Sequence, residues 1–208
     1  MRTYRVLLIG NGEAVTAHRL AQLAREADYI LAADGGAQNA LQAHLTPHGI
    51  IGDLDSLSTS LKKHFRGELF HVPTQENTDL EKALHWAIKK HTTHLTLVGF
   101  VGKRWDFSIA NMLTLATYAQ QLHICIVGEN WRIYALTHNK QLACAKNKRL
   151  SLIPITPCSG VTLSGCSYPL KNECLTPGTT RTLSNQTTAA HVRLRLASGT
   201  LLLYIEGI

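Results

Sequence analysis

The amino-acid sequence predicts an α/β protein in which a parallel-sheet, Rossmann-like domain is followed by a small antiparallel β-sandwich. Up to residue 128, short apolar runs alternate with segments of helical period, as expected when helices cover both faces of a parallel sheet. From residue 129 the helical period is lost, and short apolar stretches are separated by Gly, Pro, Ser, Thr and Asn. We therefore expect two domains, 1–128 and 129–208.

The strands and helices of the first domain follow from its periodicity. Apolar runs predict strands at 5–9, 29–33, 69–72, 95–98 and 123–127. Between 78 and 90, apolar residues recur at i, i+3, i+4, i+7 and i+8, which predicts a helix. Thr78 and Glu81 have capping-box spacing, so this helix should begin at Thr78 and carry Asp79 in its first turn. A second helix is expected from about 107 to 121, through an apolar face made of Ile109, Met112, Leu113 and Ala116.

The second domain is predicted from its short apolar stretches at 132–136, 149–155, 160–166, 191–196 and 200–205. Residues 192–196 (VRLRL) alternate as a half-buried strand should. Acidic residues do not cluster in this half. We therefore expect it to supply binding surface rather than metal chemistry.

Composition narrows the class of protein. No apolar run is long enough to span a bilayer, and the apolar N-terminal run is too short for a signal peptide. Five cysteines without a CxxC pair suit free thiols in a reducing cytoplasm. We expect a cytoplasmic protein that has no membrane partner.

The net charge of +7 lies mostly in the second half. Residues 1–128 have 12 Lys and Arg against 11 Asp and Glu, whereas residues 129–208 have 9 against 3. This asymmetry could mark a nucleic-acid surface. The basic residues are scattered singly, however, and no nucleic-acid motif is present, so a solvated basic face without a nucleic-acid partner is favoured.

Three aspartates carry the strongest functional signal. Asp53 and Asp55 lie in GDLDS (52–56), and Asp79 lies in QENTDL (75–80). Both stretches are turn-like and follow apolar runs that read as strands. Carboxylates without neighbouring His or Cys suit a hard cation, and Mg²⁺ is favoured because it binds one or two carboxylates together with substrate phosphates. This pattern indicates an enzyme that handles a nucleoside triphosphate.

Two glycine motifs also follow predicted strands. The GNG stretch could present backbone N–H groups to phosphate, or it could be a plain tight turn. In ADGGA (33–37) the two glycines would let a ligand approach the backbone, while the aspartate either faces that ligand or caps the next helix. The predicted nucleotide-binding residues of these motifs are Gly10, Asn11, Gly12, Asp34, Gly35 and Gly36.

The segment GKRWDF (102–107) places two cations after a strand. Lys103 and Arg104 are suited to gripping phosphates. Asp106 could pair with either of them as a simple surface salt bridge. Because ligands of parallel sheets bind beyond the carboxyl ends of the strands, all these motifs should meet at one edge.

The order of the motifs resembles the thiamine pyrophosphokinase (thiamine diphosphokinase) family over nearly the whole chain. The matching stretches are DGGA (34–37), GDLDS (52–56), QENTDLEKAL (75–84), GFVGKRWDF (99–107) with IAN (109–111), GVTLSGCSYPL (160–170) and Ser184–Asn185. Three positions depart from the family pattern. Gln38 replaces the usual Asn, Lys103 the second Gly of the fourth motif, and Phe107 its His.

The resemblance implies transfer of a pyrophosphoryl group from ATP to the hydroxyethyl group of thiamine, giving thiamine diphosphate and AMP. Asp53, Asp55 and Asp79 would hold Mg²⁺, and Asp79 would also accept the hydroxyl proton. Lys103 and Arg104 would neutralise phosphoryl charge. The predicted catalytic set is completed by Asp106.

On the substrate side, the resemblance implies that Gln75 and Ser184 hydrogen-bond the aminopyrimidine, with Asn185 adjacent. It also implies a homodimer in which one subunit's β domain completes the thiamine site of the other. An ordinary β-turn is the alternative for 184–185. Trp131 and Tyr204 are candidates for stacking on thiamine, although each could equally belong to the core.

Two other functions stay open at this point. One is a pyrophosphokinase or phosphoryl transferase on the same scaffold that acts on another alcohol, such as a pterin. The other is a non-enzymatic nucleotide- or RNA-binding protein, which only the basic second half favours.

Overall fold

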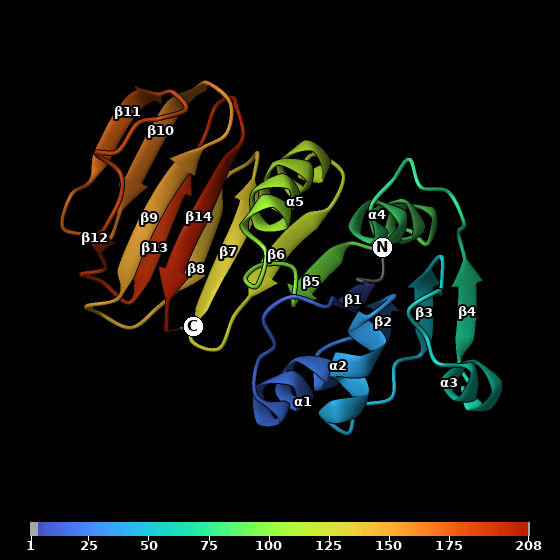
Figure 1. Ribbon diagram of the computed structural model, residues 1–208. Helices are drawn as coiled ribbons and strands as arrows, with labels where there is room; N and C mark the ends of the chain where they lie inside the picture. The colour runs from blue at the N-terminus through green and yellow to red at the C-terminus, as the bar shows by residue number, and fades with distance from the viewer. Residues whose placement is uncertain (1–3, 208) are drawn as a thin grey trace. The chain divides into compact units, whose positions relative to one another are not determined.

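The computed structural model describes residues 4–207, which fold as two compact units that divide between Thr114 and Leu115. Unit 1 is an α/β domain, and unit 2 is built mainly of β-strands (Figure 1). The division between units falls inside the last helix, α5, whereas the sequence analysis places the domain boundary after residue 128. Within residues 4–207, no helix combines the length and the apolar character needed to cross a bilayer.

The sheet of unit 1 is parallel throughout. Its strands are β1 (Arg5–Ile9), β2 (Tyr29–Ala33), β3 (Gly49–Gly52), β4 (Glu68–His71) and β5 (His94–Val98). They are ordered β5-β1-β2-β3-β4, and the buried Leu8 of β1 lies opposite Leu31 and Leu97. All five carboxyl ends therefore reach the same edge, as predicted.

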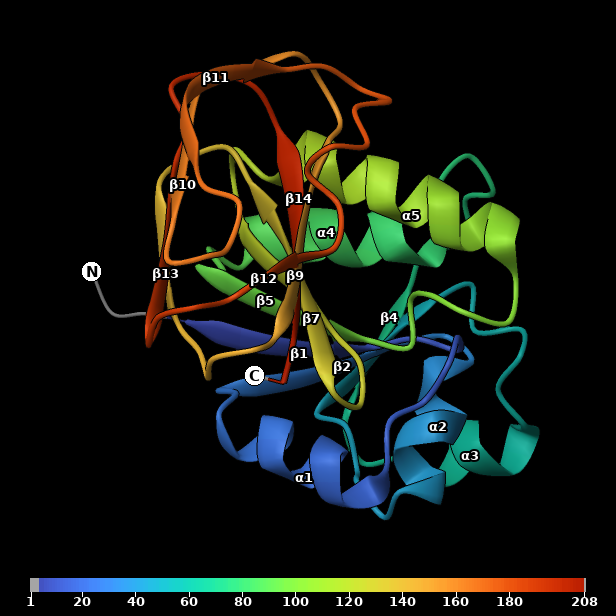
Figure 2. The same ribbon diagram turned by 90° about the vertical axis from the view of Figure 1, so that its left-hand side faces the viewer.

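Helices cover both faces of this sheet. They are α1 (Ala17–Arg25), α2 (Gly36–Gln42), α3 (Thr59–His64), α4 (Asp79–Lys89) and α5 (Trp105–Tyr118). Figure 2 shows α1, α2 and α3 on one side, with α4 and the start of α5 on the other. This arrangement is the one expected of a parallel sheet whose strands are apolar on both faces.

The predicted start of α4 is confirmed. Thr78 is the N-cap, and its hydroxyl accepts a hydrogen bond from the backbone N–H of Glu81 at 3.3 Å. The Glu81 carboxylate in turn accepts from the backbone N–H of Thr78 at 3.1 Å. The capping box fixes where the helix begins, and so places Asp79 in its first turn.

The prediction for α5 is wrong about part of its buried face. The helix begins at Trp105 rather than near 107, and Ile109 and Leu113 are 59% and 51% exposed, whereas Ala116 is buried as predicted. The buried side also contains Leu115 and two polar residues, Ser108 and Asn111. The Ser108 hydroxyl donates to the Arg104 carbonyl at 2.8 Å, and the Asn111 amide donates to the Phe100 carbonyl at 2.7 Å. Satisfied polar groups can occupy a buried face, which an apolar period does not detect.

Unit 2 is an antiparallel sandwich, and this prediction is confirmed. One sheet has the order β12-β9-β14-β7-β6 within the unit, and the other has the order β11-β10-β13-β8. The strands are β6 (His123–Val127), β7 (Trp131–Leu136), β8 (Lys140–Ala143), β9 (Arg149–Pro154), β10 (Cys158–Ser164), β11 (Leu170–Leu175), β12 (Asn185–Gln186), β13 (His191–Arg195) and β14 (Leu201–Glu206).

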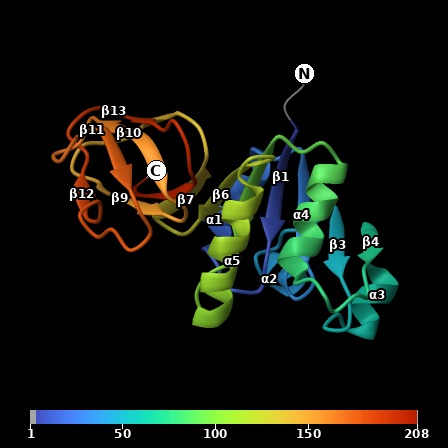
Figure 3. The same ribbon diagram turned by 90° about the horizontal axis from the view of Figure 1, so that it is seen from above.

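The core of unit 2 lies between its two sheets, which face each other in Figure 3. On β13, Val192 and Leu194 point into this core, whereas Arg193 and Arg195 are exposed. This is the alternation predicted for 192–196. Strands β8 and β11 were not predicted, because their sequences KQLA and LKNECL contain too few apolar residues to produce the pattern.

Candidate active site

The loops at the carboxyl ends of the unit 1 strands surround a pocket of about 380 Å³. The chain segments that line it follow β1, β2 and β5 and begin α4 and α5. Eight of the predicted site residues line this pocket: Gly10, Asn11, Gly12, Asp34, Gly35, Asp79, Lys103 and Arg104. The sequence therefore predicted most of the polar lining.

A compact group of acids lies beside this pocket. Carboxylate oxygens of Asp34, Asp53 and Asp55 all lie within 4.8 Å of one another. Asp34 is 8% exposed, and its Oδ1 has no hydrogen-bond partner among the described residues. It does not cap α2, because the N-cap is Gly35 and that helix has no side-chain cap. A buried carboxylate oxygen without a partner is unfavourable unless a ligand completes its contacts.

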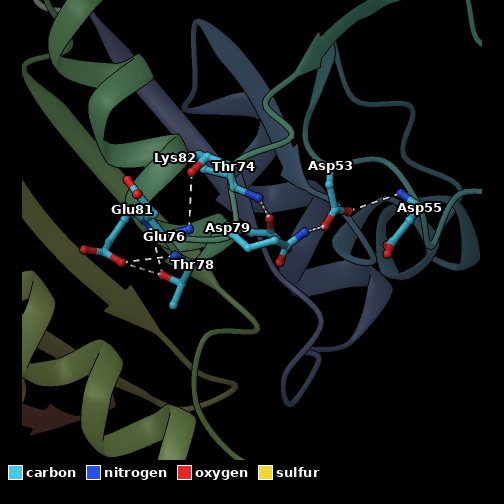
Figure 4. Close-up of polar contacts among 9 residues, drawn as sticks. Asp53, Asp55, Thr74, Glu76, Thr78, Asp79, Glu81 and Lys82 are labelled. Carbon is cyan, nitrogen blue, oxygen red and sulfur yellow. Dashed lines mark hydrogen bonds and ion pairs between the residues drawn. The ribbon is translucent and has the colours of Figure 1, made fainter.

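Asp53 is held from two sides (Figure 4). The Gln75 amide donates to its Oδ2 at 3.0 Å, and the backbone N–H of Asp55 donates to its Oδ1 at 3.2 Å. The bond from Gln75 is the main reason that the pKa of Asp53 is lowered. The exposed carboxyl of Asp55 has a raised pKa, because it lies against the Asp53 carboxylate. Like charges held this close favour a bound cation.

Asp79 reaches the pocket from the first turn of α4. Its Oδ1 accepts from the Lys82 ammonium at 3.1 Å, and the Lys82 side chain is only 3% exposed (Figure 4). Burial raises the pKa of Asp79, the Lys82 ammonium opposes this shift, and the charges of Asp34 and Asp53 add to it. The close acidic group thus contains Asp34, which was predicted only as a nucleotide contact, and does not include Asp79.

Gly52 lets these acids converge. A Cβ atom at this position would lie 2.8 Å from the Cβ of Asp34 and 3.3 Å from Oδ1 of Asp79. Any side chain there would push the two carboxylates apart. The glycine that opens the GDLDS motif is therefore part of the site's geometry.

The GNG turn is packed against the loop that follows β5. The backbone N–H of Gly10 donates to the Val98 carbonyl at 2.8 Å, and that of Gly12 donates to the Gly99 carbonyl. A Cβ on Gly10 or Gly12 would lie 2.6 Å from the Gly99 carbonyl oxygen. These two amides are used inside the protein and are not directed at a ligand, so the glycines serve close packing.

Gly36 and Asn39 fix the start of α2 against the same turn. A Cβ on Gly36 would lie 2.1 Å from the carbonyl oxygen of Ile9, so only glycine lets α2 approach β1 this closely. The Asn39 amide donates to the Gly10 carbonyl at 2.8 Å. Gly36 supports the pocket but is not among its lining residues.

The 102–107 segment presents two cations at the pocket. Arg104 is exposed and bonded to Asp106 through both its Nε, at 3.1 Å from Oδ1, and its Nη2. The guanidinium also lies 4.4 Å from the centre of the Phe107 ring. The paired charges raise the pKa of Arg104 and lower that of Asp106. These contacts orient the guanidinium without burying it.

Lys103 occupies the position where the family pattern has glycine. Its φ is 54°, in the left-handed region that glycine adopts without strain, which accounts for that preference. Its Nζ donates to the Asn11 carbonyl at 2.9 Å and so spans the loops after β1 and β5.

Sequence reasoning missed the apolar part of the pocket. Leu80, Phe100 and Phe107 line it together with the buried Asn111. Asn111 was noted only as part of the IAN motif. Apolar residues at strand ends and in first helical turns look like ordinary core, so no signal in the sequence separates them from it.

The predicted substrate residues of unit 2 differ in their surroundings. Asn185 is buried, and its side chain bonds both the N–H and the carbonyl of Tyr168, at 3.0 and 2.7 Å. Ser184 has an exposed side chain and a φ of 56°, and its backbone N–H donates to the Ser151 hydroxyl at 3.0 Å. Asn185 thus holds its own loop, whereas the Ser184 hydroxyl faces solvent.

The two aromatic candidates for stacking on thiamine contact each other. The rings of Trp131 and Tyr204 are stacked, with centroids 6.2 Å apart, and lie on the neighbouring strands β7 and β14. The Tyr204 hydroxyl donates to the Glu206 carboxylate at 3.1 Å. The two rings thus form a partly buried pair on unit 2.

Family models match most of the chain. Residues 20–126 match the model described as thiamin pyrophosphokinase, catalytic domain, and residues 135–201 match the model described as thiamin pyrophosphokinase, vitamin B1 binding domain. The chain belongs to the thiamin pyrophosphokinase family. It is therefore an enzyme, a kinase of the transferase class that transfers pyrophosphate from ATP to thiamine.

Individual members of the thiamin pyrophosphokinase family are similar over most of their length. Thiamin pyrophosphokinase 1 of Caenorhabditis elegans is 26% identical, with 94% of this chain and 86% of that protein covered. Thiamine pyrophosphokinase of Bacillus subtilis (strain 168) is 27% identical, with 82% and 83% covered. A crystal structure of thiamine pyrophosphokinase from Bacillus subtilis superposes with a TM-score of 0.84 at 22% identity, over 98% of this chain and 99% of that one, and shows the same fold.

The family match settles the open alternatives. It supports neither a pterin pyrophosphokinase nor a non-enzymatic nucleotide- or RNA-binding protein.

Proposed function

We propose that Asp34, Asp53 and Asp55 hold the Mg²⁺ complex of ATP, from which the chain transfers the terminal pyrophosphoryl group to the hydroxyethyl oxygen of thiamine. The products are thiamine diphosphate and AMP. The observation that carries this proposal is the buried Asp34 Oδ1, which has no hydrogen-bond partner within residues 4–207, in a side chain whose carboxylate lies close to those of Asp53 and Asp55. A cation would complete its contacts.

The donor set suits Mg²⁺. It consists of carboxylate oxygens only, which hard divalent cations prefer over the nitrogen and sulfur ligands of transition metals. Gln75 orients Asp53 from outside this set, as a supporting residue does in many metal sites. When bound, Mg²⁺ would supply positive charge against the phosphoryl oxygens, where charge develops during transfer.

Arg104 and Lys103 bind the phosphates from the opposite loop. Both side chains are exposed at the pocket, and each is oriented by a contact within unit 1. Asp106 and the Phe107 ring hold the guanidinium plane. Its remaining N–H donors can therefore bind the phosphoryl oxygens with little further loss of side-chain conformational entropy. Leu80 and Phe100 offer an apolar surface for the adenosine.

Asp79 is the base of the reaction. It stands outside the close acidic group, lines the pocket, and has a pKa raised by burial, which makes its carboxylate a better proton acceptor. As the thiamine oxygen forms its bond to the β-phosphorus, the hydroxyl proton passes to Asp79. The bond from that phosphorus to the oxygen of AMP breaks, and AMP leaves with the bonding electrons.

Thiamine is bound with the help of a second subunit. The exposed residues Trp105, Ile109 and Leu113 recur at i, i+4 and i+8 on α5, and Trp105 is 78% exposed. An exposed apolar stripe of this kind supports a protein interface, and we propose that the partner is a second copy of this chain, as the family resemblance implies. We assign the Ser184 hydroxyl and Gln75 to the aminopyrimidine, and Asn185 to holding the Ser184 loop.

We place the enzyme in the cytoplasm. Cys158 and Cys166 are buried free thiols, which persist in a reducing compartment.

Loss of the Ser184 hydroxyl should affect the two substrates unequally. One hydrogen bond to a neutral ring contributes about 0.5–1.5 kcal/mol, so Ser184→Ala should raise the KM for thiamine several-fold with the KM for ATP nearly unchanged. Ser184→Gly should behave in the same way. Because glycine adopts the left-handed backbone of this position without strain, this variant shows that the effect comes from loss of the hydroxyl and not from backbone strain. Ser164→Ala, at an exposed position on β10, is the matched control. Steady-state kinetics with each substrate varied would decide, and equal impairment of both substrates would refute the assignment.

The shared site can be tested by mixing subunits of two impaired variants, assayed at a thiamine concentration below the raised KM. If Ser184 of one copy serves the pocket of the other, a heterodimer of Ser184→Ala and Asp53→Asn subunits contains one site free of both changes. Mixing the two variants should therefore restore part of the wild-type activity. No recovery, after subunit exchange is verified by mass spectrometry, would mean that each chain builds its own site.

The activity itself is tested by product analysis. The purified chain should convert ATP and thiamine to equimolar AMP and thiamine diphosphate, with no product in excess EDTA. Formation of ADP and thiamine monophosphate, or turnover of a pterin alcohol in preference to thiamine, would contradict the proposal.

A further inference from the structure

We infer that Lys82 is a positioning residue for the reaction, which fixes the Asp79 carboxylate at the edge of the pocket. The inference rests on the role proposed above for Asp79. Lys82 is not among the pocket-lining residues and lies behind Asp79, one helical turn further along α4. It therefore acts through Asp79 rather than on the substrates.

The burial of Lys82 calls for a functional explanation. Its side chain is only 3% exposed, and its neighbours one turn away on α4 include Asp79 and the buried Trp86. Asp79 is the one hydrogen-bond partner of this ammonium among the described residues, although an ammonium has three N–H donors. A buried ion pair is a weak source of net stability, because apolar side chains that replace both partners often serve the fold as well.

Three restraints converge on Asp79. The Thr78–Glu81 capping box fixes the first turn of α4, and hence the backbone of Asp79. Gly52 leaves room for Oδ1, which would lie 3.3 Å from a Cβ at that position. Lys82 then binds Oδ1 at 3.1 Å and sets the orientation of the carboxylate. A base must lie within hydrogen-bond reach of the proton it accepts, so this orientation bears directly on the rate.

Lys82→Met tests the inference, because methionine keeps the apolar stem and removes the charge and the donors. The kcat should fall about 10- to 100-fold, the range typical of residues that orient a catalytic ligand. The KM for ATP should change little, and the melting temperature should fall only modestly, because the Asp79 side chain is 37% exposed and stays partly hydrated without its partner. Mn²⁺ binding, measured by the EPR signal of free Mn²⁺ with a non-hydrolysable ATP analogue present, should also be retained. Lys89→Met, at an exposed position on the same helix, should match wild type in all four measurements.

A double-mutant cycle separates positioning from simple charge balance. If Lys82 acts through Asp79, Lys82→Met should have no further effect on kcat in an Asp79→Asn background. A further fall in that background, or an unchanged kcat in the single variant, would overturn the inference. If methionine prevents folding, Lys82→Gln replaces it in the same comparison. The proposed function is tested separately, by comparing Mn²⁺ binding in wild type and in Asp53→Asn. Equal binding in both proteins would refute the proposed metal site.

Discussion

Replacing Asp53 by asparagine should lower turnover by about 10³-fold or more while leaving the fold intact. The amide keeps the shape of the side chain and can still accept the hydrogen bond from the backbone of Asp55, but it loses the charge that would hold Mg²⁺. A catalytic metal ion contributes several kcal/mol to transition-state stabilisation, and each 1.36 kcal/mol is about tenfold in rate. Initial rates of AMP formation at saturating Mg²⁺ and ATP measure the effect.

A control variant must show that the loss of turnover comes from removing a negative charge in the site, and not from removing a negative charge anywhere in the protein. Asp28→Asn is suitable, because Asp28 accepts a backbone hydrogen bond from Arg5 outside the pocket and an asparagine can replace it there. Circular dichroism should give the same spectrum for both variants and wild type. Asp55→Asn is expected to behave as Asp53→Asn does. Near-normal turnover in both aspartate variants would refute the proposed metal site.

Arg104→Ala should lower turnover by about 10²-fold. It should have little effect on the stability of the fold. Donors directed at developing phosphoryl charge typically contribute about 10²–10³ in kcat. The bond between Arg104 and Asp106 is exposed on both sides, and exposed ion pairs contribute little to folding. The measurement is kcat with ATP, alongside the melting temperature.

A matched arginine shows whether the effect belongs to the site. Arg25 is exposed in the last turn of α1, and Arg25→Ala should leave kcat unchanged. Arg104→Lys should recover part of the activity, because it restores charge but not the planar fork. Unchanged kinetics in Arg104→Ala would place this guanidinium on an ordinary solvated surface.

Much of the fold could be predicted because local rules and tertiary structure agree. The capping box at Thr78 and Glu81 placed the start of α4 correctly, and the alternation at 192–196 placed β13. Parallel strands bring their carboxyl ends to one edge, so the motifs that follow them were expected to meet. Local patterning and the global arrangement are consistent in these segments.

The site was predicted less completely, because burial is a tertiary property. An apolar period misplaced Ile109 and Leu113 of α5 on the buried face, where Ser108 and Asn111 instead hold the neighbouring loop. The sequence could not show that Asp34 would be buried beside Asp53, with no hydrogen-bond partner for its Oδ1 in residues 4–207. Nor could it show that Lys82 of α4 would be buried against Asp79.

The sequence was also ambiguous about what the glycine motifs contact. A G-x-G turn predicts close approach without saying which group approaches. Here the approaching group is the loop after β5, which takes up the amides of Gly10 and Gly12.

The central claim is that the acids after β2 and β3 hold the metal of the ATP complex. A crystal structure with Mn²⁺ and a non-hydrolysable ATP analogue, phased to locate Mn²⁺ by anomalous scattering, tests it most directly. We expect an anomalous peak about 2 Å from carboxylate oxygens of Asp53 and of Asp34 or Asp55. A peak bonded only to the nucleotide, or located away from these three residues, would contradict it.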